Sequence, residues 1–451
     1  MRGGHIHVAG VAGVGMSALA QALTWTHARV TGSDRFFDAG SDLPIFAALR
    51  AGGVELVKQD GAAIDAHTTA VAYSTAIEDD NPDVVAARRH GVPLRHRAAV
   101  LAELAHGHTV LAVAGTAGKT TTTGMLGWLL EQLGADPTVI NGGALVAWAR
   151  AGGVGSVRRG TPDAPWVIEV DESDRSLLNF HPQWSILTNI SQDHFTLAEV
   201  MELFRAYAAQ VQTGIVCGAG VAAALGAPAA RLVEVATPPE HDSAGWFVTW
   251  RGQQLRVPQP GAHNALNALL AAEQATQLGH APGAIAEALT RFAGVQRRLE
   301  RADANGPVRV VDDYAHNPAK IVAAWQAVAE PGRRVLGVWR PHGYGPLRSM
   351  LAALTDAFAT ACRPTDQLWL LPVFDAGGTA NRSIQSRDLA EALRVRGVNA
   401  ALPETYDALG AELLAAARPG DTILLMGARD PRLPVFAAEI AARCAARQET
   451  P

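Results

Sequence analysis

The stretch LAVAGTAGKTTTT, at residues 111–123, constrains the fold of this chain more than any other. An apolar run from Leu111 to Ala114 enters a glycine-containing turn, and Lys119 and four threonines then open a predicted helix. In this order, backbone N–H groups and the helix N-terminus can surround a polyphosphate. Lys119 would place a positive charge beside the β- and γ-phosphates, and the Thr120 hydroxyl would bind Mg²⁺. The segment therefore predicts a strand–turn–helix unit with a site for ATP.

The match to the common phosphate-loop spacing, G-x-x-x-x-G-K-[ST], is imperfect because Val113 stands where the first glycine falls. An ordinary strand-to-helix turn is the alternative. Composition favours the phosphate site, since the chain has only three lysines, Lys58, Lys119 and Lys320. Arginine carries nearly all the remaining positive charge, so the presence of a lysine at this position indicates a specific role.

Size and charge narrow the class of protein. A length of 451 residues suggests roughly three domains. A net charge of −5 and a pI near 6.3 argue against a general nucleic-acid binder. The three cysteines show no metal-ligand spacing, which predicts free thiols and a cytoplasmic location. We expect no secretory segment and no membrane span, and interpret the uncharged tract at 206–230 as a buried helix–strand–turn.

Apolar strand-like runs alternate with helical stretches along the whole chain, which predicts an α/β fold of parallel sheets covered by helices. We expect domains at 1–107, 108–299 and 300–451, and a regular helix at Pro260–Leu278. The predicted strands are His5–Ala9, Arg29–Thr31, Glu55–Leu56, Thr69–Tyr73, Leu111–Ala114, Pro137–Ile140, Trp166–Val170, Trp184–Asn189, Val308–Asp312, Arg334–Trp339, Gln367–Pro372 and Thr422–Met426.

A second glycine-rich turn, GVAGVGMS at residues 10–17, follows the first predicted strand. Its glycines would let the backbone approach a diphosphate at the start of a helix. Asp34 lies at the spacing expected for an acid on a ribose hydroxyl. A UDP-type diphosphate and a nicotinamide dinucleotide explain the turn equally well, and a turn without ligand remains a third possibility.

Carboxylates end the strand in VIEVDESD, residues 167–174. Glu169 emerges where an acid would meet Mg²⁺ directly or through water. Asp171, Glu172 and Asp174 are equally consistent with solvated loop acids. The next strand leads into TNISQDH, which ends in His194. We expect His194 at the same sheet edge as Glu169, although imidazole is an unusual ligand for Mg²⁺.

Three later motifs add polar groups. GAHNALNA, residues 261–268, sets Asn264 and Asn267 three apart on one helix face, where their amides could read an adenine edge or cap the helix. GVQRRLE contains Arg298, which could hold a γ-phosphoryl group, and VVDDYAHNP contains Asp313, which could hold a ribose hydroxyl. Solvated surface charges are the alternative for both.

Taken in order, these motifs resemble the Mur ligase family, the ATP-dependent amide-bond ligases of peptidoglycan synthesis. The resemblance spans nearly the whole chain. The matching pieces are GVAGVGMS, GTAGKTTTT, EVDESD, TNISQDH, GAHNALNA, GVQRRLE, DDYAHNP and GDTILLMGARD.

The resemblance implies three domains: a Rossmann-like domain for a UDP substrate, a central ATPase domain with a phosphate-loop-type parallel sheet, and a Rossmann-like C-terminal domain that closes over the site. It implies ATP and Mg²⁺ as cofactors, with Lys119, Glu169, His194 and Arg298 as catalytic residues. The implied metal ligands are Thr120, Glu169 and His194. The implied ATP-binding residues are Gly115, Thr116, Ala117, Gly118, Lys119, Thr120, Thr121, Asn264, Asn267, Arg298 and Asp313. The implied substrate-binding residues are Gly13, Gly15, Met16, Ser17, Asp34, Ser74 and His342.

The first turn and the DESD form are most similar to the members that join L-alanine to UDP-N-acetylmuramate through an acyl phosphate. We therefore expect a UDP-sugar carboxylate and an amino acid as substrates, and Ser173 favours this branch over the one that recycles murein tripeptide. Ala117 replaces a histidine usual in these members, QDHFTLAEV departs from the usual continuation, and Arg429 stands where the family usually has glycine. A paralogous ligase with another substrate, a nicotinamide-dependent oxidoreductase and an inactive Mur-like scaffold remain open alternatives.

Overall fold

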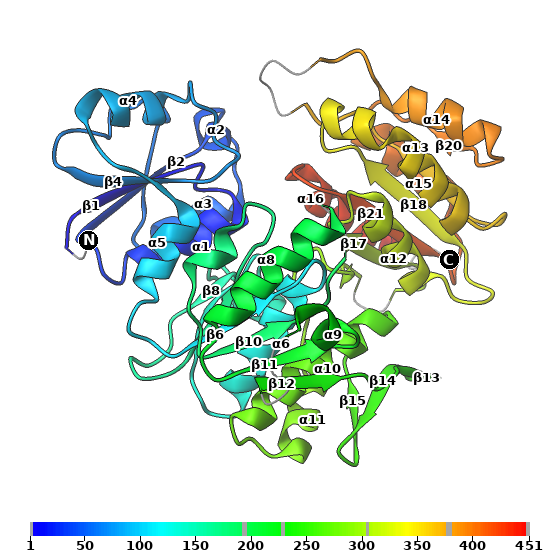
Figure 1. Ribbon diagram of the computed structural model, residues 1–451. Coiled ribbons are helices and arrows are strands. Elements are labelled where there is room, and N and C mark those ends of the chain that lie inside the picture. The colour runs from blue at the N-terminus through cyan, green and yellow to red at the C-terminus, as the bar shows by residue number, and fades with distance from the viewer. Residues whose placement is uncertain (1–2, 192–195, 227–230, 304–305, 376–380, 448–451) are drawn as a thin grey trace. The chain divides into compact units, whose positions relative to one another are not determined.

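The computed structural model describes residues 3–191, 196–226, 231–303, 306–375 and 381–447, and it divides into two compact units (Figure 1). The first unit comprises Met1–Pro258 and Ala262–Val295, and the second comprises Gln259–Gly261 and Gln296–Pro451. Each unit is built on parallel sheets flanked by helices, which confirms the predicted α/β class.

The N-terminal sheet of the first unit has five parallel strands in the order β3-β2-β1-β4-β5. Its strands are β1 (His5–Ala9), β2 (Arg29–Ser33), β3 (Glu55–Val57), β4 (Thr68–Tyr73) and β5 (Leu94–His96). Its helices are α1 (Val14–Leu23), α2 (Arg35–Asp38), α3 (Pro44–Ala51), α4 (Pro82–His90) and α5 (Arg97–Leu104). The strand order reverses between β1 and β4, and ligands of such sheets bind beside the carboxyl ends of the strands at this point.

The second sheet of this unit has seven strands in the order β12-β11-β10-β6-β9-β7-β8, of which β8 alone is antiparallel to its neighbour. Its strands are β6 (Val110–Ala114), β7 (Thr138–Ile140), β8 (Val157–Arg158), β9 (Trp166–Glu169), β10 (Trp184–Leu187), β11 (Gly214–Gly218) and β12 (Leu232–Val235). All five residues of β6 are buried, as expected for a central strand covered on both faces.

Helices and one small antiparallel sheet complete the first unit. The helices are α6 (Lys119–Gln132), α7 (Val146–Arg150), the 3₁₀-helix η1 (Ser176–Asn179), α8 (Leu197–Gln210), α9 (Val221–Leu225), α10 (Ala262–Gln277) and α11 (Pro282–Thr290). The antiparallel strands are β13 (Glu240–Asp242), β14 (Gly245–Trp250) and β15 (Gln253–Arg256).

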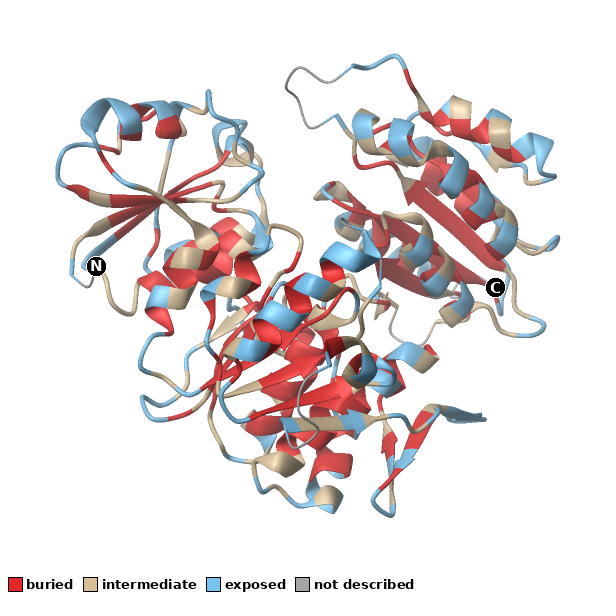
Figure 2. Cartoon of the chain, viewed as in Figure 1, coloured by how far each residue is buried: buried red, intermediate tan, exposed pale blue. Residues whose placement is uncertain are grey.

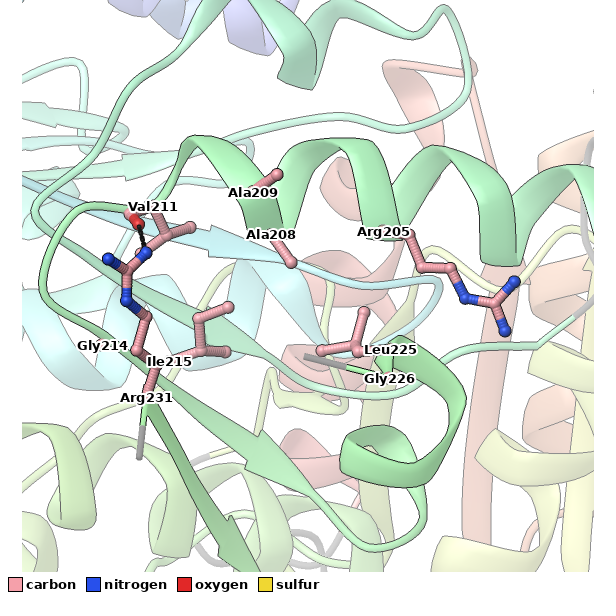
Figure 3. A pocket seen from close by; sticks show the side chains of 9 residues that line it. All are labelled: Arg205, Ala208, Ala209, Val211, Gly214, Ile215, Leu225, Gly226 and Arg231. Atoms are coloured by element: carbon pink, nitrogen blue, oxygen red, sulfur yellow. Dashed lines mark hydrogen bonds between the residues drawn. The ribbon is translucent and has the colours of Figure 1, made fainter. Parts of the chain in front are cut away.

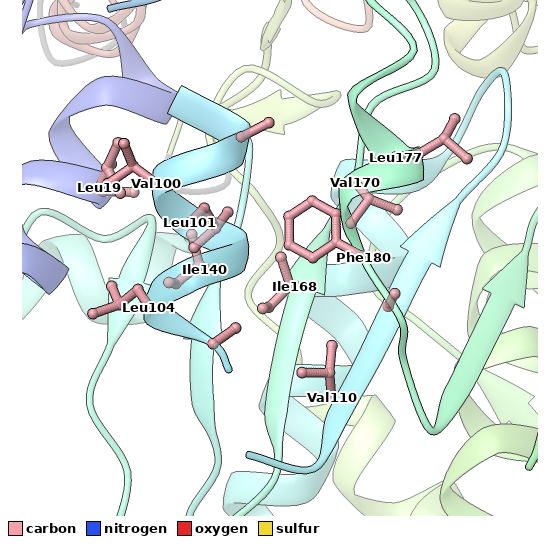
Figure 4. Close-up of a cluster of buried hydrophobic side chains, with 14 of the residues drawn as sticks. Leu19, Val100, Leu101, Leu104, Val110, Ile140, Ile168, Val170, Leu177 and Phe180 are labelled. Atoms are coloured by element: carbon pink, nitrogen blue, oxygen red, sulfur yellow. The ribbon is translucent and has the colours of Figure 1, made fainter. Parts of the chain in front are cut away.

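One apolar core runs through both sheets of the first unit. Side chains of α1 and α5, among them Leu19 and Leu101, belong to the same buried cluster as Ile168 of β9 and Phe180 (Figure 4). Apolar packing therefore joins the two sheets. Buried residues concentrate on the strands and on the inward faces of the helices (Figure 2).

The second unit contains a six-stranded sheet in the order β16-β17-β21-β18-β19-β20, antiparallel only at β16. Its strands are β16 (Glu300–Arg301), β17 (Arg309–Asp313), β18 (Val335–Arg340), β19 (Gln367–Leu370), β20 (Ala400–Ala401) and β21 (Thr422–Gly427). Its helices are α12 (Pro318–Val328), α13 (Tyr344–Ala361), α14 (Ser386–Val395), α15 (Tyr406–Ala416) and α16 (Arg432–Ala446). Successive β21 residues alternate between two buried clusters, one on each face of the sheet.

The predicted strands are observed with their ends moved by at most two residues, and the predicted helix at 260–278 is α10. The helix after the first glycine turn begins at Val14. The tract at 206–230 contains the end of α8 and the buried strand β11, as predicted, but the short helix α9 follows where a turn was expected, and residues 227–230 lie outside the described residues. Within the described residues, no helix has both the length and the apolar character needed to cross a bilayer.

Candidate active site

The predicted phosphate loop connects the central strand β6 to helix α6. Gly115 and Gly118 have φ values of 128° and 86°, a region that favours glycine. A Cβ on Gly118 would lie 2.6 Å from Oδ1 of Asn267, so this glycine also allows α10 to approach the loop. No side chain caps the N-terminus of α6. The first-turn amides of α6 are thus arranged as an anion-binding helix start.

Two side chains from the end of β10 hold the loop in place. Asn189 accepts a hydrogen bond from the N–H of Ala117 at 3.1 Å and donates to its carbonyl at 2.8 Å. The Thr188 hydroxyl donates to the same carbonyl at 2.6 Å. Sequence reasoning missed Thr188 and Asn189, although both stand in the TNISQDH motif. The backbone at Ala117 is therefore fixed by its neighbours, whichever side chain the residue has.

Lys119, the first residue of α6, points back into the loop. Its Nζ donates to the Gly115 carbonyl at 2.8 Å and to Oε2 of Glu172 at 2.6 Å, and lies 3.5 Å from the Thr116 carbonyl. Burial by itself would lower the pKa of Lys119, but the charges of Glu172 and nearby acids outweigh burial and raise it. Lys119 is therefore a charged lysine at neutral pH.

Glu172, which the sequence left as one of three equivalent loop acids, is 4% exposed and pairs with Lys119. Burial raises the pKa of Glu172 to about 7, and Asp171 adds to this effect while Lys119 opposes it. Glu172 is therefore a buried acid paired with the lysine of the phosphate loop. It is not the solvated loop acid that the sequence allowed as an alternative. The contact between Glu172 and Lys119 depends on how the chain turns after β9. The sequence DESD does not reveal that turn.

Thr120 and Glu169 meet beside the loop, as a metal site there requires. The Thr120 hydroxyl donates to Oε1 of Glu169 at 3.1 Å, and the N–H of Gly142 donates to Oε2 at 2.7 Å. A hydroxyl and a carboxylate are oxygen ligands of the kind that Mg²⁺ prefers. In the part of the chain that the structure describes, no three His, Cys, Asp or Glu side chains gather as a metal site. His194, the third predicted ligand, lies outside the described residues.

Asn264 and Asn267 lie together on α10 as predicted, with Nδ2 of Asn267 3.5 Å from Oδ1 of Asn264. Both are buried, at 3% and 7% exposure. The close approach of Asn267 to Gly118 brings this pair to the phosphate loop. Their part in adenine binding remains a prediction.

The first glycine-rich turn is exposed at Gly13, which precedes α1 without any side-chain cap. Asp34 accepts hydrogen bonds from Ala12 N–H at 3.0 Å and Phe36 N–H at 2.9 Å, so it anchors the turn in addition to any contact with ribose. Ser74 follows β4 and so lies at the same sheet edge.

Met16 and Ser17 are buried in the fold, at 4% and 1% exposure. The Ser17 hydroxyl donates to the Val14 carbonyl at 2.9 Å. Their side chains are thus engaged in packing and in the helix. Gly15, which precedes Met16, is partly exposed.

In the second unit, Arg298 and Asp313 lie at one edge of the sheet. The Arg298 guanidinium lies 5.5 Å from the centre of the Tyr314 ring. Asp313 accepts hydrogen bonds from the N–H groups of Leu299 and Ala315, at 2.8 and 2.7 Å. Burial raises the pKa of Asp313 to about 6, against the opposing charge of Arg298.

His342 follows β18 and packs edge-on against His316, with ring centres 5.0 Å apart. Burial, with the charges of Arg429 and Lys320, lowers the pKa of His342 to about 4, so it is neutral at pH 7. Arg429 has a φ of 66°, so the backbone keeps the left-handed conformation that suits the glycine usual at this position.

A cavity of about 210 Å³ lies elsewhere in the first unit, between α8, β11 and α9 (Figure 3). Its wall includes Gly214, the first residue of β11, whereas the phosphate loop leaves the opposite, carboxyl ends of these parallel strands. This cavity is therefore separate from the predicted site.

Two family models match the chain: "Mur ligase family, catalytic domain" at residues 5–109, and "Mur ligase, glutamate ligase domain" at residues 297–429. The UDP-N-acetylmuramate–L-alanine ligase of Gloeobacter violaceus is 34% identical over 440 residues, covering 94% of this chain and 92% of that protein. The chain belongs to the Mur ligase family. A protein of the same name from Symbiobacterium thermophilum is 36% identical over 464 residues, with the same coverage of each chain.

Solved structures of Mur ligases share the fold. The UDP-N-acetylmuramate–alanine ligase of Thermotoga maritima superposes with a TM-score of 0.78 at 25% identity, covering 99% of both chains. A murein peptide ligase of Psychrobacter arcticus gives a TM-score of 0.68 at 21% identity, covering 98% of this chain and 99% of that one. The predicted membership of the Mur ligase family is thereby confirmed.

Proposed function

We propose that the protein is an ATP-dependent ligase that joins the amino group of L-alanine to the carboxylate of UDP-N-acetylmuramate. The observation that carries this proposal is the phosphate loop, after which Lys119 and Thr120 begin α6 and Thr120 meets Glu169 of β9, within a chain that resembles alanine-adding ligases over 94% of its length. A glycine-rich turn at the start of α1, in the same unit, supplies a second anion site.

The reaction has two chemical steps. The substrate carboxylate attacks the γ-phosphorus of ATP, which gives an acyl phosphate and ADP. The alanine amine then attacks the acyl carbon, and the tetrahedral intermediate releases phosphate. In the first step Lys119 moves from Glu172 to the phosphate oxygens, where its charge offsets the charge that develops. The amides at the start of α6 hold the same phosphates.

The donor set at Thr120 and Glu169 fits Mg²⁺, because this ion commonly takes one or two carboxylates and completes its shell with water and phosphate. Bound there, Mg²⁺ would neutralise phosphate charge and align the γ-phosphoryl group. We propose His194 as a further ligand. Asn264 and Asn267 would hold the adenine, as their position beside Gly118 supports.

We keep the division into domains at 1–107, 108–299 and 300–451 as part of the proposal. Arg298 and Asp313 would reach ATP, and His342 would lie near the amino acid, on the domain that closes during the reaction. Closure would exclude water, since hydrolysis of the acyl phosphate would waste ATP. We infer a cytoplasmic location from the proposed substrates, ATP and a UDP-sugar.

The test measures the release of phosphate from ATP in the presence of Mg²⁺. UDP-N-acetylmuramate and single amino acids are added in turn. We expect turnover with the UDP-sugar only when an amino acid is present, and L-alanine should give the highest kcat/KM. The product should gain the mass of one alanine minus water.

Each alternative gives a different result in this screen. Turnover with another carboxylate or amino acid, and none with this pair, would move the protein to a paralogous branch. No turnover with any pair, but tight ATP binding, would indicate an inactive scaffold. Reduction or oxidation of a nicotinamide cofactor would indicate an oxidoreductase.

A further inference from the structure

Asp83, the second residue of α4, is a buried acid, 0% exposed. Its Oδ2 accepts a hydrogen bond from the Ser33 hydroxyl at 2.5 Å and lies 3.2 Å from Nε2 of His7. Its Oδ1 accepts from the N–H of Gly61 at 3.1 Å. His7 and Ser33 belong to β1 and β2, and Gly61 follows β3. One carboxyl group therefore ties α4 to three other segments around the N-terminal sheet.

Fold stability does not account for an acid at this position. Burial by itself would raise the pKa of Asp83, but hydrogen bonds from His7, Ser33 and Gly61 outweigh burial and lower it, so the acid is a carboxylate. Taking a carboxylate out of water costs free energy, and apolar side chains of similar volume often stabilise a fold as well or better. What the carboxylate provides is a fixed position for each group that donates to it.

The first glycine-rich turn rests on the last residues of β2. The Ser33 carbonyl accepts a hydrogen bond from the N–H of Val11 at 2.9 Å, and Asp34 accepts from the N–H of Ala12 at 3.0 Å. Gly32 permits this close approach, because a Cβ at that position would lie 2.7 Å from Cγ2 of Val11. The position of the turn therefore depends on the position of Ser33.

The segment that leads into α4 touches the same turn. A Cβ on Gly10 would lie 2.9 Å from Cδ1 of Ile77, so the two segments are in direct contact. Asn81 caps α4 by accepting a hydrogen bond from the N–H of Asp83 at 3.0 Å. Asp83 therefore acts on the turn along two routes, through Ser33 of β2 and through the segment before α4.

We propose that Asp83 is a positioning residue for the UDP-sugar: it keeps the first glycine-rich turn in the conformation that binds this substrate. The inference rests on the proposed function and adds to it a buried residue that acts through Ser33. When this hold is lost, the binding-competent conformation becomes less populated, and the apparent affinity falls by the same factor. The phosphate loop belongs to the other sheet of the first unit, so ATP binding should not change.

The test is calorimetric titration of the whole protein with UDP-N-acetylmuramate in the absence of ATP. Asp83→Asn and Ser33→Ala should each weaken binding about tenfold. Because both substitutions act on the contact between Ser33 and Asp83, the double variant should bind about as weakly as either single variant.

Thr68→Val is the matched control. Thr68 is also buried, and its hydroxyl lies 3.2 Å from Nδ1 of His5, at the opposite, amino end of the same parallel strands. This variant loses a buried polar contact of the same sheet without touching the turn. It should bind UDP-N-acetylmuramate within twofold of the wild type.

Steady-state kinetics separate a positioning role from a structural one. Asp83→Asn and Ser33→Ala should raise the KM for UDP-N-acetylmuramate about tenfold, because less of the enzyme is competent to bind. The kcat at saturating substrates and the affinity for a non-hydrolysable ATP analogue should stay within twofold of the wild type. Thermal unfolding shows which variants are folded at the assay temperature, and Ser33→Ala decides if Asp83→Asn is not.

Three results would overturn the inference and leave the proposed function intact. The first is wild-type affinity for the UDP-sugar in a folded Asp83→Asn or Ser33→Ala variant. The second is an equal loss of affinity for the UDP-sugar and the ATP analogue, and the third is a loss in Thr68→Val as large as that in Asp83→Asn. A wild-type protein that binds no UDP-N-acetylmuramate would overturn both proposals.

Discussion

At the scale of single residues, Lys119 is held by acceptors of its own loop and by Glu172. An ammonium has three N–H donors, so phosphate must replace these contacts rather than add to them. Glu172 thus holds the lysine in position before the nucleotide binds. The sequence identifies Lys119 as the phosphate-binding lysine. It does not identify Glu172 as the residue that pairs with Lys119 when no nucleotide is bound.

Replacing Lys119 by Ala should reduce kcat by about 10²-fold or more, because the developing phosphate charge loses its cation. Binding of UDP-N-acetylmuramate should be unchanged, since that ligand is assigned to the turn at α1. Phosphate-release kinetics and calorimetry measure the two effects. Lys58→Ala, at an exposed lysine of the same unit, is the control. Substantial ligase turnover in the Lys119 variant would refute the assignment of the ATP site.

Among the acids after β9, Glu169 and Asp174 have different surroundings. Glu169 accepts from the Thr120 hydroxyl, whereas Asp174 accepts from the Ser176 N–H and lies 3.4 Å from Nε2 of His96. Glu169→Ala should raise the Mg²⁺ concentration for half-maximal activity about tenfold and lower kcat, because Mg²⁺ loses its carboxylate. Asp174→Ala is the comparison in a Mg²⁺ titration of turnover. If the second variant is the damaged one, the metal carboxylate has been misassigned.

At the scale of elements, the site is built where parallel strands end. The order strand–turn–helix and the apolar runs were readable from the sequence, because each strand is short, buried and bounded by a turn. The pairing of β10 with β6 could not be predicted from the sequence, since it joins residues more than 70 positions apart. The role of Asn189 depends on that pairing, which is why the motif alone did not reveal it.

Asn189→Ala should raise the KM for ATP about tenfold, because the loop loses two hydrogen bonds that fix the backbone of Ala117. Steady-state kinetics with varied ATP at saturating UDP-sugar test this. Asn179→Ala is the control, since within the described residues the Asn179 amide donates only to the Ser176 carbonyl, outside the loop. An unchanged KM for ATP would mean that the loop is held mainly by Thr188.

At the scale of the whole molecule, Glu172 makes stability depend on pH. Its pKa is about 7 in the folded protein and 4.5 ordinarily, so between these values the folded chain keeps a proton that the unfolded chain has lost. The free energy of unfolding should therefore fall as pH rises from about 4.5 to 7. In Glu172→Gln this decrease, on the order of 3 kcal/mol, should be absent.

Urea denaturation at pH 5, 6, 7 and 8 compares the two proteins. Glu202→Gln, at an exposed acid of α8, should follow the wild-type curve. Parallel curves for wild type and Glu172→Gln would show that Glu172 titrates near its ordinary pKa in the folded protein.

The α/β class and the order of motifs could be predicted for the whole molecule because period and turn residues are local signals. The arrangement around His342 could not be predicted, since β17, β21 and β18 bring residues from three distant segments of the chain to one edge of the sheet. The strained backbone at Arg429 is a related case. The sequence shows an arginine replacing glycine, and only the structure shows that the glycine-like conformation is retained.

The apolar core shared by the two sheets of the first unit has a consequence for how this chain comes apart. Side chains of α1 and α5 are buried against β9 and the segment after it, so neither sheet has a complete core without the other. The two sheets should therefore melt in one cooperative transition, despite being separate sheets. A fragment that begins after α5 should expose this apolar surface and aggregate, whereas the second unit, with cores on both faces of its own sheet, should remain folded when expressed alone.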